Sequence, residues 1–364
     1  MRGDAYKAEE MLSTCTYSGL LSINVAAIVE NWKQLNRIVS CGAVVKADAY
    51  GLGMEPVSCA LAHEGCRDFF VALPSEGCEL RRALPSTEVR IYVLSGPLDD
   101  GQTLVDQHLC PILNSLERIS TWQHNAPNSP YGLHIDTGMN RLGLALSDLE
   151  QIPPNVNPYL VMSHLACADT PTHPLNTLQR DRFASIRNKF PKAQASLSNS
   201  AALFLGKSFL FDLGRPGLAL YGGNPLSKHP NPMQTVVTLD LTILQIRTVD
   251  TEGTVGYGGT RTVTPGMRLA VASAGYADGL LCTLANQGSG FVQGIRVPVI
   301  GRVSMDLITF DISELPEDSV VPGDTICVLG PNYTVDDLAE DADTIPYQIL
   351  TGLSQRYTRN WRGV

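Results

Sequence analysis

The feature that most constrains the fold is a regular alternation of short apolar runs and amphipathic segments between residues 20 and 222. Eight apolar runs are present, at 42–47, 68–73, 89–94, 109–113, 131–136, 158–164, 194–197 and 209–215. Segments with helical spacing lie before and between them, at 25–39, 54–64, 75–84, 114–123 and 176–189. Near-continuous apolar strands are typical of a parallel sheet, and eight strand–helix units predict a closed (β/α)8 TIM barrel. A doubly wound open sheet is the alternative, but no GxGxxG turn follows the first strand.

The pattern changes after residue 232, where apolar runs are separated by Gly, Pro and Asp turns. Such runs occupy 235–247, 267–273, 294–300, 307–312 and 325–329, and helical spacing returns only at 335–340 and 346–356. This texture predicts a mainly β domain, and the Gly/Pro/Asn-rich segment 222–233 predicts its boundary. We therefore expect a mobile extension over residues 1–15, a barrel over 16–232 and a β domain over 233–364.

The charge and cysteine content restrict the possible partners. A net charge of −9 and a pI of about 5.3 argue against a general nucleic-acid or anionic-membrane binder, which needs a basic surface. Nine scattered cysteines without a CxxC pair indicate reduced thiols and a cytoplasmic protein. Neither a signal-peptide pattern nor an eighteen-residue apolar window is present, so no membrane span is expected.

Ionisable and polar residues gather at the C-terminal ends of the expected strands, which is where barrels of this type carry their chemistry. They are Lys46 after the first strand, His134, Asp136 and Arg141 after the fifth, His164 after the sixth, Ser198–Ser200 after the seventh and Arg215 after the eighth. Each alone has an ordinary explanation, such as a solvated lysine, a tight turn or a structural histidine. Their convergence on one rim favours a functional site.

Two short segments of this rim suggest a phosphate site. Ser198–Ser200 is expected to open one helix, and Gly217–Ala219 a short helical piece after the eighth strand. Helix starts bind anions, and barrels build phosphate sites after strands seven and eight. A phosphate site near a rim lysine suggests pyridoxal 5'-phosphate, with Lys46 forming the Schiff base. No metal-ligand spacing and no GxSxG nucleophile motif competes with this interpretation.

Eight motifs carry a resemblance to one family. AVVKADAYGLG, HIDTGMNRLG, SHLACAD, SLSNSAA, GRPGLALYG, GYGGTRTV, GYADG and GRVSMDL run in order from residue 43 to 308. Together they resemble the bacterial alanine racemases, which combine a (β/α)8 barrel with a β domain. The resemblance implies a pyridoxal phosphate enzyme that interconverts L- and D-alanine and supplies D-alanine for peptidoglycan. It also implies a head-to-tail homodimer.

The resemblance further implies roles for individual residues. Lys46 would be one catalytic base, and Tyr257 of the partner subunit the second on the opposite face. The implied cofactor contacts are Lys46, Tyr50, Arg141, His164, Asn199, Ser200, Arg215, Gly217, Leu218 and Tyr357. Arg141, Met305 and Tyr276 would contact the substrate, and Met305, like Tyr257, would come from the partner subunit. Asp306 would order the site without contacting the substrate itself. Without the resemblance, a packed strand-edge tyrosine is the simpler explanation of Tyr257.

The chain departs from the family pattern near Arg141. Many members have a carbamylated lysine two residues before the Asp of DTGM, whereas this chain has His134. A chloride-like anion, or His134 and Asp136 directly, would then hold Arg141, because a buried arginine without a counterion is costly. The C-terminal tyrosine of the family is also displaced: alignment puts Gln355 at its place, with Tyr357 two residues on.

Three other functions stay open from sequence. A racemase of broader specificity, or one for serine, would need the same groups around a roomier pocket. A non-catalytic pyridoxal phosphate carrier would need neither the β domain nor Tyr257. A barrel-plus-β decarboxylase of basic amino acids is disfavoured by the order of the motifs, including Tyr257 and the SMD segment.

Overall fold

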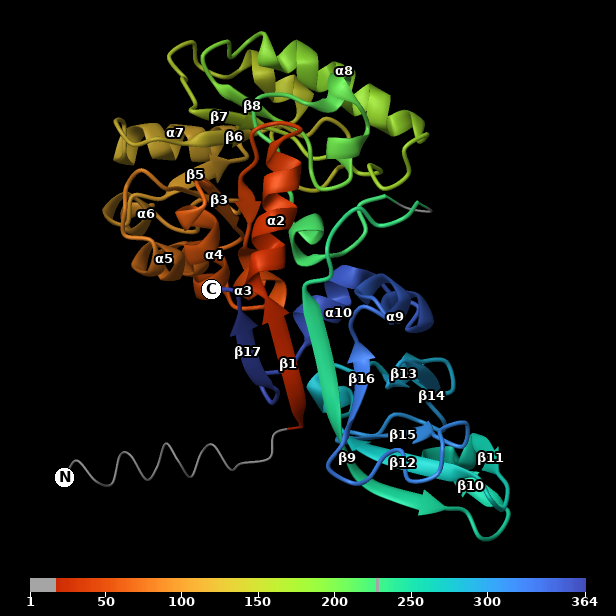
Figure 1. The fold of residues 1–364 in the computed structure, drawn as a ribbon. Coiled ribbons are helices and arrows are strands. Elements are labelled where there is room, and N and C mark those ends of the chain that lie inside the picture. Colours follow the sequence, from red (N-terminus) through yellow and green to blue (C-terminus); the bar gives the residue numbers. More distant parts are fainter. Residues whose placement is uncertain (1–17, 227–228) are drawn as a thin grey trace, which may run out of the picture. The chain divides into compact units, whose positions relative to one another are not determined.

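The computed structural model describes residues 18–226 and 229–364 (Figure 1). The described chain divides into two compact units, one formed by residues 24–236 with 363–364 and the other by 18–23 with 237–362. We call them the barrel unit and the β unit and describe each by itself.

The barrel unit is built on a parallel sheet whose seven strands follow one another in chain order. They are β2 (Ala43–Val44), β3 (Asp68–Val71), β4 (Arg90–Val93), β5 (Cys110–Leu113), β6 (Gly132–His134), β7 (Leu160–Met162) and β8 (Gln194–Ser196). Almost every residue of these strands is buried, as expected for a sheet covered on both faces. Each strand lies within its expected run.

The eighth expected strand, 209–215, closes the barrel without forming a regular strand. Leu213 donates its N–H to the carbonyl of Ala195 in β8 (3.1 Å), and Gly214 donates to the carbonyl of Ser40, just before β2 (2.8 Å). A parallel bridge also joins Cys41 to Gly214. A longer ladder is prevented because Pro216 has no N–H to donate. The barrel prediction is confirmed, with an irregular eighth segment.

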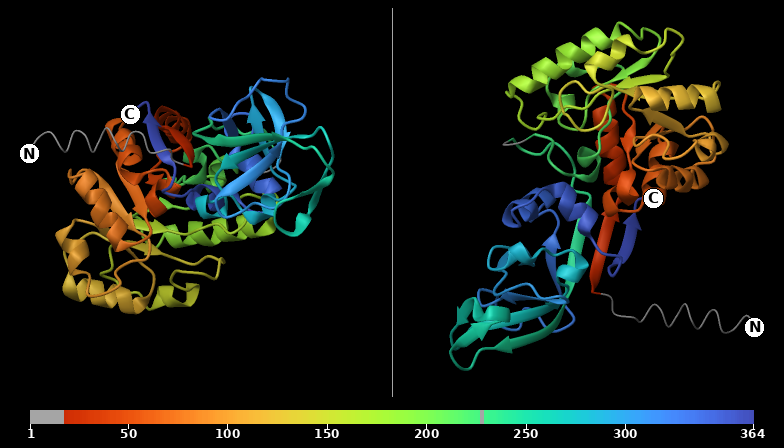
Figure 2. Two further views of the ribbon diagram at one scale, coloured as in Figure 1. Left: turned by 90° about the horizontal axis from the view of Figure 1, so that it is seen from below. Right: turned by 180° about the vertical axis from the view of Figure 1, so that it is seen from behind.

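The helices of the barrel unit lie outside this curled sheet (Figure 2). They are α2 (Val25–Asn36), α4 (Met54–His63), α5 (Pro74–Ala83), α6 (Gln102–Asp106), α7 (Leu116–Asn125) and α8 (Pro174–Arg187). The short element α3 (Lys46–Gly51) is instead a left-handed turn at the end of β2. The α2 helix begins where the Asn24 side chain accepts a hydrogen bond from the Ala27 N–H (3.0 Å), and it buries Ile28, Trp32 and Leu35. No helix in the described part of the chain is long and apolar enough to cross a bilayer.

The β unit contains an eight-stranded sheet and a separate hairpin. The sheet strands are β1 (Gly19–Asn24), β9 (Val237–Thr248), β12 (Arg268–Ser273), β13 (Ser289–Val292), β14 (Ile295–Pro298), β15 (Leu307–Asp311), β16 (Thr325–Leu329) and β17 (Thr358–Arg362). The hairpin pairs β10 (Gly253–Val255) with β11 (Arg261–Val263), and two helices follow, α9 (Val335–Asp341) and α10 (Pro346–Gly352). The mainly β prediction is confirmed.

The first strand belongs to the β unit. β1 pairs antiparallel with β9, with Leu21 opposite Leu239. Residues 18–23 therefore lie outside the barrel that was expected to begin at residue 16, and the second boundary falls at 236/237 rather than 232/233. Sequence pattern does not reveal such a pairing, because its two strands are separated by the whole barrel. The extension expected over residues 1–15 lies outside the described residues.

Candidate functional site

Lys46 lies at the C-terminal end of β2 and opens a left-handed turn. The next four residues, Ala47 to Tyr50, have φ values of 52°, 55°, 52° and 57°. Left-handed backbone costs about 1–2 kcal/mol for each residue other than glycine. Side-chain bonds hold this turn: Glu76 Oε1 accepts from the Ala47 N–H (2.7 Å), and Asp48 Oδ1 accepts from the Met54 N–H (2.7 Å). A strained, fixed backbone next to a rim lysine is typical of a functional site.

The electrostatic surroundings of Lys46 favour a neutral amine. Burial lowers the pKa of Lys46, and the positive charge of Arg141 lowers it further, while the Glu76 carboxylate acts in the opposite direction. A lysine in such surroundings can act as a nucleophile and as a base.

Tyr50, Ser200 and Gly217 come together in the barrel unit. The Ser200 Oγ accepts hydrogen bonds from the N–H groups of Gly217 (3.0 Å) and Ala219 (3.2 Å). A Cβ atom on Gly217 would lie 2.2 Å from the Tyr50 hydroxyl, so this oxygen lies directly against the Gly217 backbone. The Tyr50 ring packs on Tyr221, with ring centroids 4.8 Å apart. Two hydroxyls and several backbone N–H groups thus gather in a small region suited to an anion.

The expected helix starts in this region are single 3₁₀ turns. Residues 198–200 precede the turn Ala202–Phe204, and Gly217 precedes the turn Leu218–Tyr221. Asn199 Oδ1 accepts from the Ala202 N–H (3.0 Å) and so caps the first turn. In the second turn, as at any helix start, the leading N–H groups have no acceptor within the turn. The donors near Tyr50 are therefore local N–H groups rather than the end of a long helix.

Arg215 is buried, with 4% of its surface exposed, and two serines hold it. Its guanidinium donates to the Ser163 carbonyl (2.6 Å) and to the Ser196 hydroxyl. Burial lowers the pKa of Arg215 to about 9, so the group is still charged at neutral pH. Burial and the charges of Arg215 and Arg141 hold the pKa of His164 well below its usual value. The two serines, which the sequence reasoning did not identify, orient Arg215 in this structure.

The turn that carries Arg141 is folded by Asp136. Asp136 Oδ1 accepts from the N–H groups of Gly138 (2.8 Å) and Met139 (2.7 Å), and Oδ2 accepts from the Arg141 N–H (3.3 Å). Burial acts to raise the pKa of Asp136, but these backbone donors outweigh it and lower the pKa overall. The carboxylate thus holds the backbone of Arg141. Arg141 is exposed rather than buried as expected, so the cost of burying an unpaired arginine does not arise here. It makes no ion pair with any residue that the structure describes.

His134 is 7% exposed and lies near both arginines. Burial, Arg215 and Arg141 lower the pKa of His134 to about 4, although Asp136 acts to raise it. His134 is therefore neutral at physiological pH and supplies no negative charge to Arg141. It does not replace a carbamylated lysine electrostatically.

The β unit presents at its surface the expected second base, Tyr257, and two of the expected substrate residues, Met305 and Tyr276. Tyr257 is 70% exposed, Met305 53% and Tyr276 45%. Tyr276 and Met305 are neighbours, because the Tyr276 N–H donates to the Ser304 carbonyl and the Ala277 N–H donates to the Met305 carbonyl (both 3.0 Å). Exposed aromatic and methionine side chains of this kind are typical of interaction sites.

Asp306 directly follows Met305, whereas Tyr357 is buried within the β unit. Asp306 forms an ion pair with Arg356 (2.9 Å), which also contacts Asp278 (3.3 Å). Tyr357 is only 2% exposed and lies against Gly19, and its hydroxyl has no hydrogen-bond partner among the described residues. This burial gives no support to the prediction that Tyr357 contacts the cofactor.

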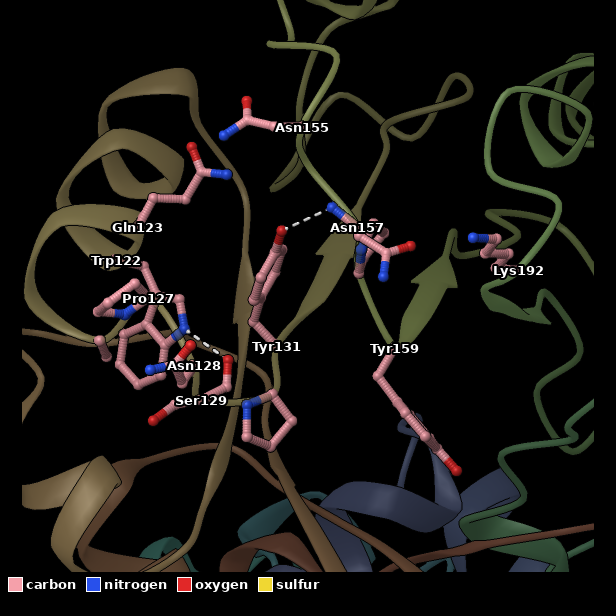
Figure 3. A pocket seen from close by; sticks show the side chains of 13 residues that line it. Trp122, Gln123, Pro127, Asn128, Ser129, Tyr131, Asn155, Asn157, Tyr159 and Lys192 are labelled. Atoms are coloured by element: carbon pink, nitrogen blue, oxygen red, sulfur yellow. Dashed lines mark hydrogen bonds between the residues drawn. The ribbon is translucent and has the colours of Figure 1, made fainter.

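The barrel unit has a hollow of about 480 Å³, whose lining side chains are shown in Figure 3. Its lining includes Trp122, Tyr131, Asn157, Tyr159 and Lys192. Tyr131 and Tyr159 immediately precede β6 and β7, so the hollow is at the N-terminal end of the barrel strands, opposite Lys46. Among the described residues, no cluster of three or more His, Cys, Asp or Glu side chains could hold a metal ion.

Two family models together match most of the chain. Residues 23–225 match the family model of the alanine racemase N-terminal domain, and residues 236–361 match that of the C-terminal domain. The alanine racemase of Rhodospirillum rubrum is 46% identical over 95% of this chain and 96% of its own length. A catabolic alanine racemase of Agrobacterium fabrum is 44% identical over 94% of this chain and 92% of its own.

A solved structure is equally similar in fold. The alanine racemase of Bartonella henselae, crystallised with covalently bound pyridoxal phosphate, superposes with a TM-score of 0.89. It is 36% identical to this chain, and the match covers 95% of this chain and all of the other.

Proposed function

The chain belongs to the alanine racemase family of isomerases, and we propose that it interconverts L- and D-alanine with two bases, Lys46 on one face of the substrate α-carbon and Tyr257 of the partner subunit on the other. Inversion requires a proton to leave one face and another to arrive on the opposite face. Two bases on opposite sides are the simplest arrangement that does this.

The barrel residues fit pyridoxal phosphate, the cofactor of this family. Tyr50, Ser200 and the Leu218 N–H would offer donors for its phosphate, with the Gly217 N–H holding the Ser200 hydroxyl and Asn199 holding the neighbouring turn. Lys46 would be the amine for its aldehyde, and Arg215 would be a donor for its ring nitrogen. When bound, the cofactor supplies the electron sink that acidifies the substrate α-proton. The crowding of the Tyr50 hydroxyl against Gly217 supports this assignment, because only glycine leaves room for it.

Lys46 is suited to take and return the α-proton on its face. Burial and Arg141 lower the pKa of Lys46, which favours the neutral amine that a base needs. The observation that carries the proposal is the turn that Lys46 opens at the end of β2, because its last left-handed residue, Tyr50, has its hydroxyl against the Gly217 backbone. Arg215 has donors only and stays charged, so it would leave the ring nitrogen unprotonated and limit side reactions such as transamination.

The second base requires a second subunit. The barrel offers no obvious base opposite Lys46, whereas Tyr257 is 70% exposed and free to enter another molecule's site. We place it there in a head-to-tail homodimer, together with the partner's Met305, whose backbone N–H would meet the substrate carboxylate. Tyr276 would narrow the entrance, and Asp306, paired with Arg356, would support this surface.

Arg141 would bridge the cofactor and the substrate carboxylate, with a chloride-like anion as its counterion. The two internal candidates do not serve this purpose, because His134 is neutral and Asp136 binds backbone N–H groups. An exposed guanidinium without an ion pair in the described chain has donors to offer such an anion.

The proposal includes a cytoplasmic location and the supply of D-alanine for peptidoglycan. The cysteines that the structure describes are all free, which supports a reducing compartment. Because one close relative is a catabolic enzyme, the role needs a genetic test. Deletion of the gene should make growth depend on added D-alanine; growth without it would favour alanine breakdown.

The direct test of the activity is racemisation of each alanine enantiomer by the Lys46→Ala and Tyr257→Phe variants. Both should lose nearly all activity, whereas Tyr159→Phe, at the other end of the barrel, should retain it. Full activity in Tyr257→Phe would contradict the two-base mechanism. Turnover on serine and lysine, measured in parallel, would detect broader specificity.

A further inference from the structure

Glu76 joins the loop after β3 to the residue that follows Lys46. It is the third residue of α5, and its Oε2 accepts from the N–H groups of Ala72 (2.6 Å) and Leu73 (3.1 Å), which lead into that helix. Its other oxygen, Oε1, accepts from the Ala47 N–H (2.7 Å). One carboxylate thus receives three backbone hydrogen bonds from two loops. Bonds of this kind are short and strong because the acceptor is charged.

The bond to Ala47 acts on the orientation of Lys46. The Ala47 N–H and the Lys46 carbonyl belong to the same planar peptide unit. Fixing that N–H therefore fixes the ψ angle of Lys46 and the point at which the left-handed turn begins. Ala47 is the first of the four left-handed residues, and Tyr50 is the last.

We propose that Glu76 is a positioning residue for catalysis, which holds the Lys46–Ala47 peptide so that Lys46 and Tyr50 are presented together at the cofactor site. This inference rests on the role proposed above for Lys46. Glu76 itself touches neither substrate nor cofactor in this account, and it acts through the backbone of its neighbour.

The charge of Glu76 has a second effect on the same lysine. The charged and titratable groups facing Lys46 are Arg141 and His164, from the loops after β6 and β7, and Glu76 from α5. Glu76 is the anion among them, and it raises the pKa of Lys46 against burial and Arg141. Removing its charge should therefore lower the pH at which the Lys46 amine becomes reactive.

The test uses Glu76→Gln in the full-length protein, with Glu79→Gln as the matched control. Glutamine has one accepting oxygen, so it cannot serve both Ala47 and the start of α5. Glu79 lies on the same helix and is exposed, and its side chain makes no hydrogen bond in the described structure, so its substitution removes the same charge without these bonds.

Three measurements are made on each variant. In the cofactor-free protein, hydrogen exchange at the Ala47 amide should accelerate roughly tenfold in Glu76→Gln. In the same protein, the pH at which acylation of the Lys46 amine reaches half its maximal rate should be lower than in the wild type. In the holoenzyme, kcat should fall about tenfold or more with a much smaller change in KM. Glu79→Gln should change none of these.

Two results would overturn the inference. One is unchanged Ala47 exchange and unchanged kcat in Glu76→Gln. The other is faster exchange confined to α5, together with a lower unfolding temperature and an unchanged pH dependence of Lys46 acylation. Glu76 would then only stabilise the start of α5. The proposed function has its own test: it is wrong if the Lys46→Ala variant still racemises alanine, whatever the results for Glu76→Gln.

Discussion

The Tyr50 hydroxyl lies so close to Gly217 that a single added carbon on Gly217 would be 2.2 Å from its oxygen. We expect Gly217→Ala to displace the Tyr50 hydroxyl or the 217–219 backbone and so weaken the cofactor site. Overpacking of this kind costs about 1–3 kcal/mol, so cofactor affinity should fall about tenfold. Titration of the cofactor-free protein with pyridoxal phosphate measures this directly.

The control for this substitution is Gly253→Ala. Gly253 lies in β10 and has open space around it, so an added methyl group should leave cofactor affinity unchanged. Equal affinities in Gly217→Ala and the wild type would show that Tyr50 and Gly217 do not form part of the phosphate site.

His134 should make the protein sensitive to acid. Its pKa is lowered from 6.5 to about 4 in the folded state, so unfolding takes up a proton between these values. Its contribution to stability is complete above pH 6.5 and is lost as the pH falls towards 4, to an extent on the order of 3 kcal/mol. We expect the free energy of unfolding of His134→Gln to fall less over this range than that of the wild type.

Urea unfolding at several pH values between neutral and acid tests this prediction, with the exposed His63→Gln as control. The neighbouring His164, whose pKa is also lowered, contributes in the same direction and stays in every variant. If the wild type and His134→Gln lose stability in parallel, His134 is not held in its neutral form.

Arg215 should not be replaceable by lysine. Lysine keeps the charge but not the planar fork that reaches the Ser163 carbonyl and the Ser196 hydroxyl together. Arg215→Lys should therefore lose at least about tenfold in kcat/KM, because a charged hydrogen bond contributes about 1.5–3 kcal/mol. Arg187→Lys, at a surface ion pair with Asp212, should have almost no effect. Wild-type kcat/KM in Arg215→Lys would contradict the positioning of this group.

The anion proposed at Arg141 predicts a dependence on chloride. Raising chloride at constant ionic strength, with gluconate as the replacement, should lower the KM for alanine several-fold by orienting the guanidinium. Arg141→Gln should lose this dependence together with most substrate affinity. An identical KM in the two salts would contradict the proposal that Arg141 binds an anion.

The architecture could be predicted largely from the apolar runs, because a buried parallel strand needs a continuous one. The exceptions have physical causes. Pro216 cannot extend a ladder, so the eighth strand is irregular. β1 pairs with β9 across more than two hundred residues, and a pairing so distant leaves no local pattern.

The candidate site was predictable only where barrel topology collects side chains at strand ends, as for Lys46, Ser200 and Arg215. Glu76, Ser163 and Ser196 could not be found in this way, because they act through backbone atoms or other side chains and occupy ordinary positions in sequence. The left-handed turn was hidden as well, since Ala47–Tyr50 contains no glycine to indicate it. Tyr257 carried no signal apart from the resemblance.

The most direct test of the central claim is complementation between two inactive variants. Lys46→Ala and Tyr257→Phe chains are co-expressed with different tags, and the mixed dimers are isolated and assayed for racemisation. If each site takes Lys46 from one subunit and Tyr257 from the other, every mixed dimer has one intact site. The purified mixed dimers should then show about half the wild-type activity per dimer, although each parent homodimer is inactive. Mixed dimers as inactive as their parents would contradict the account, because both bases would then belong to the same chain.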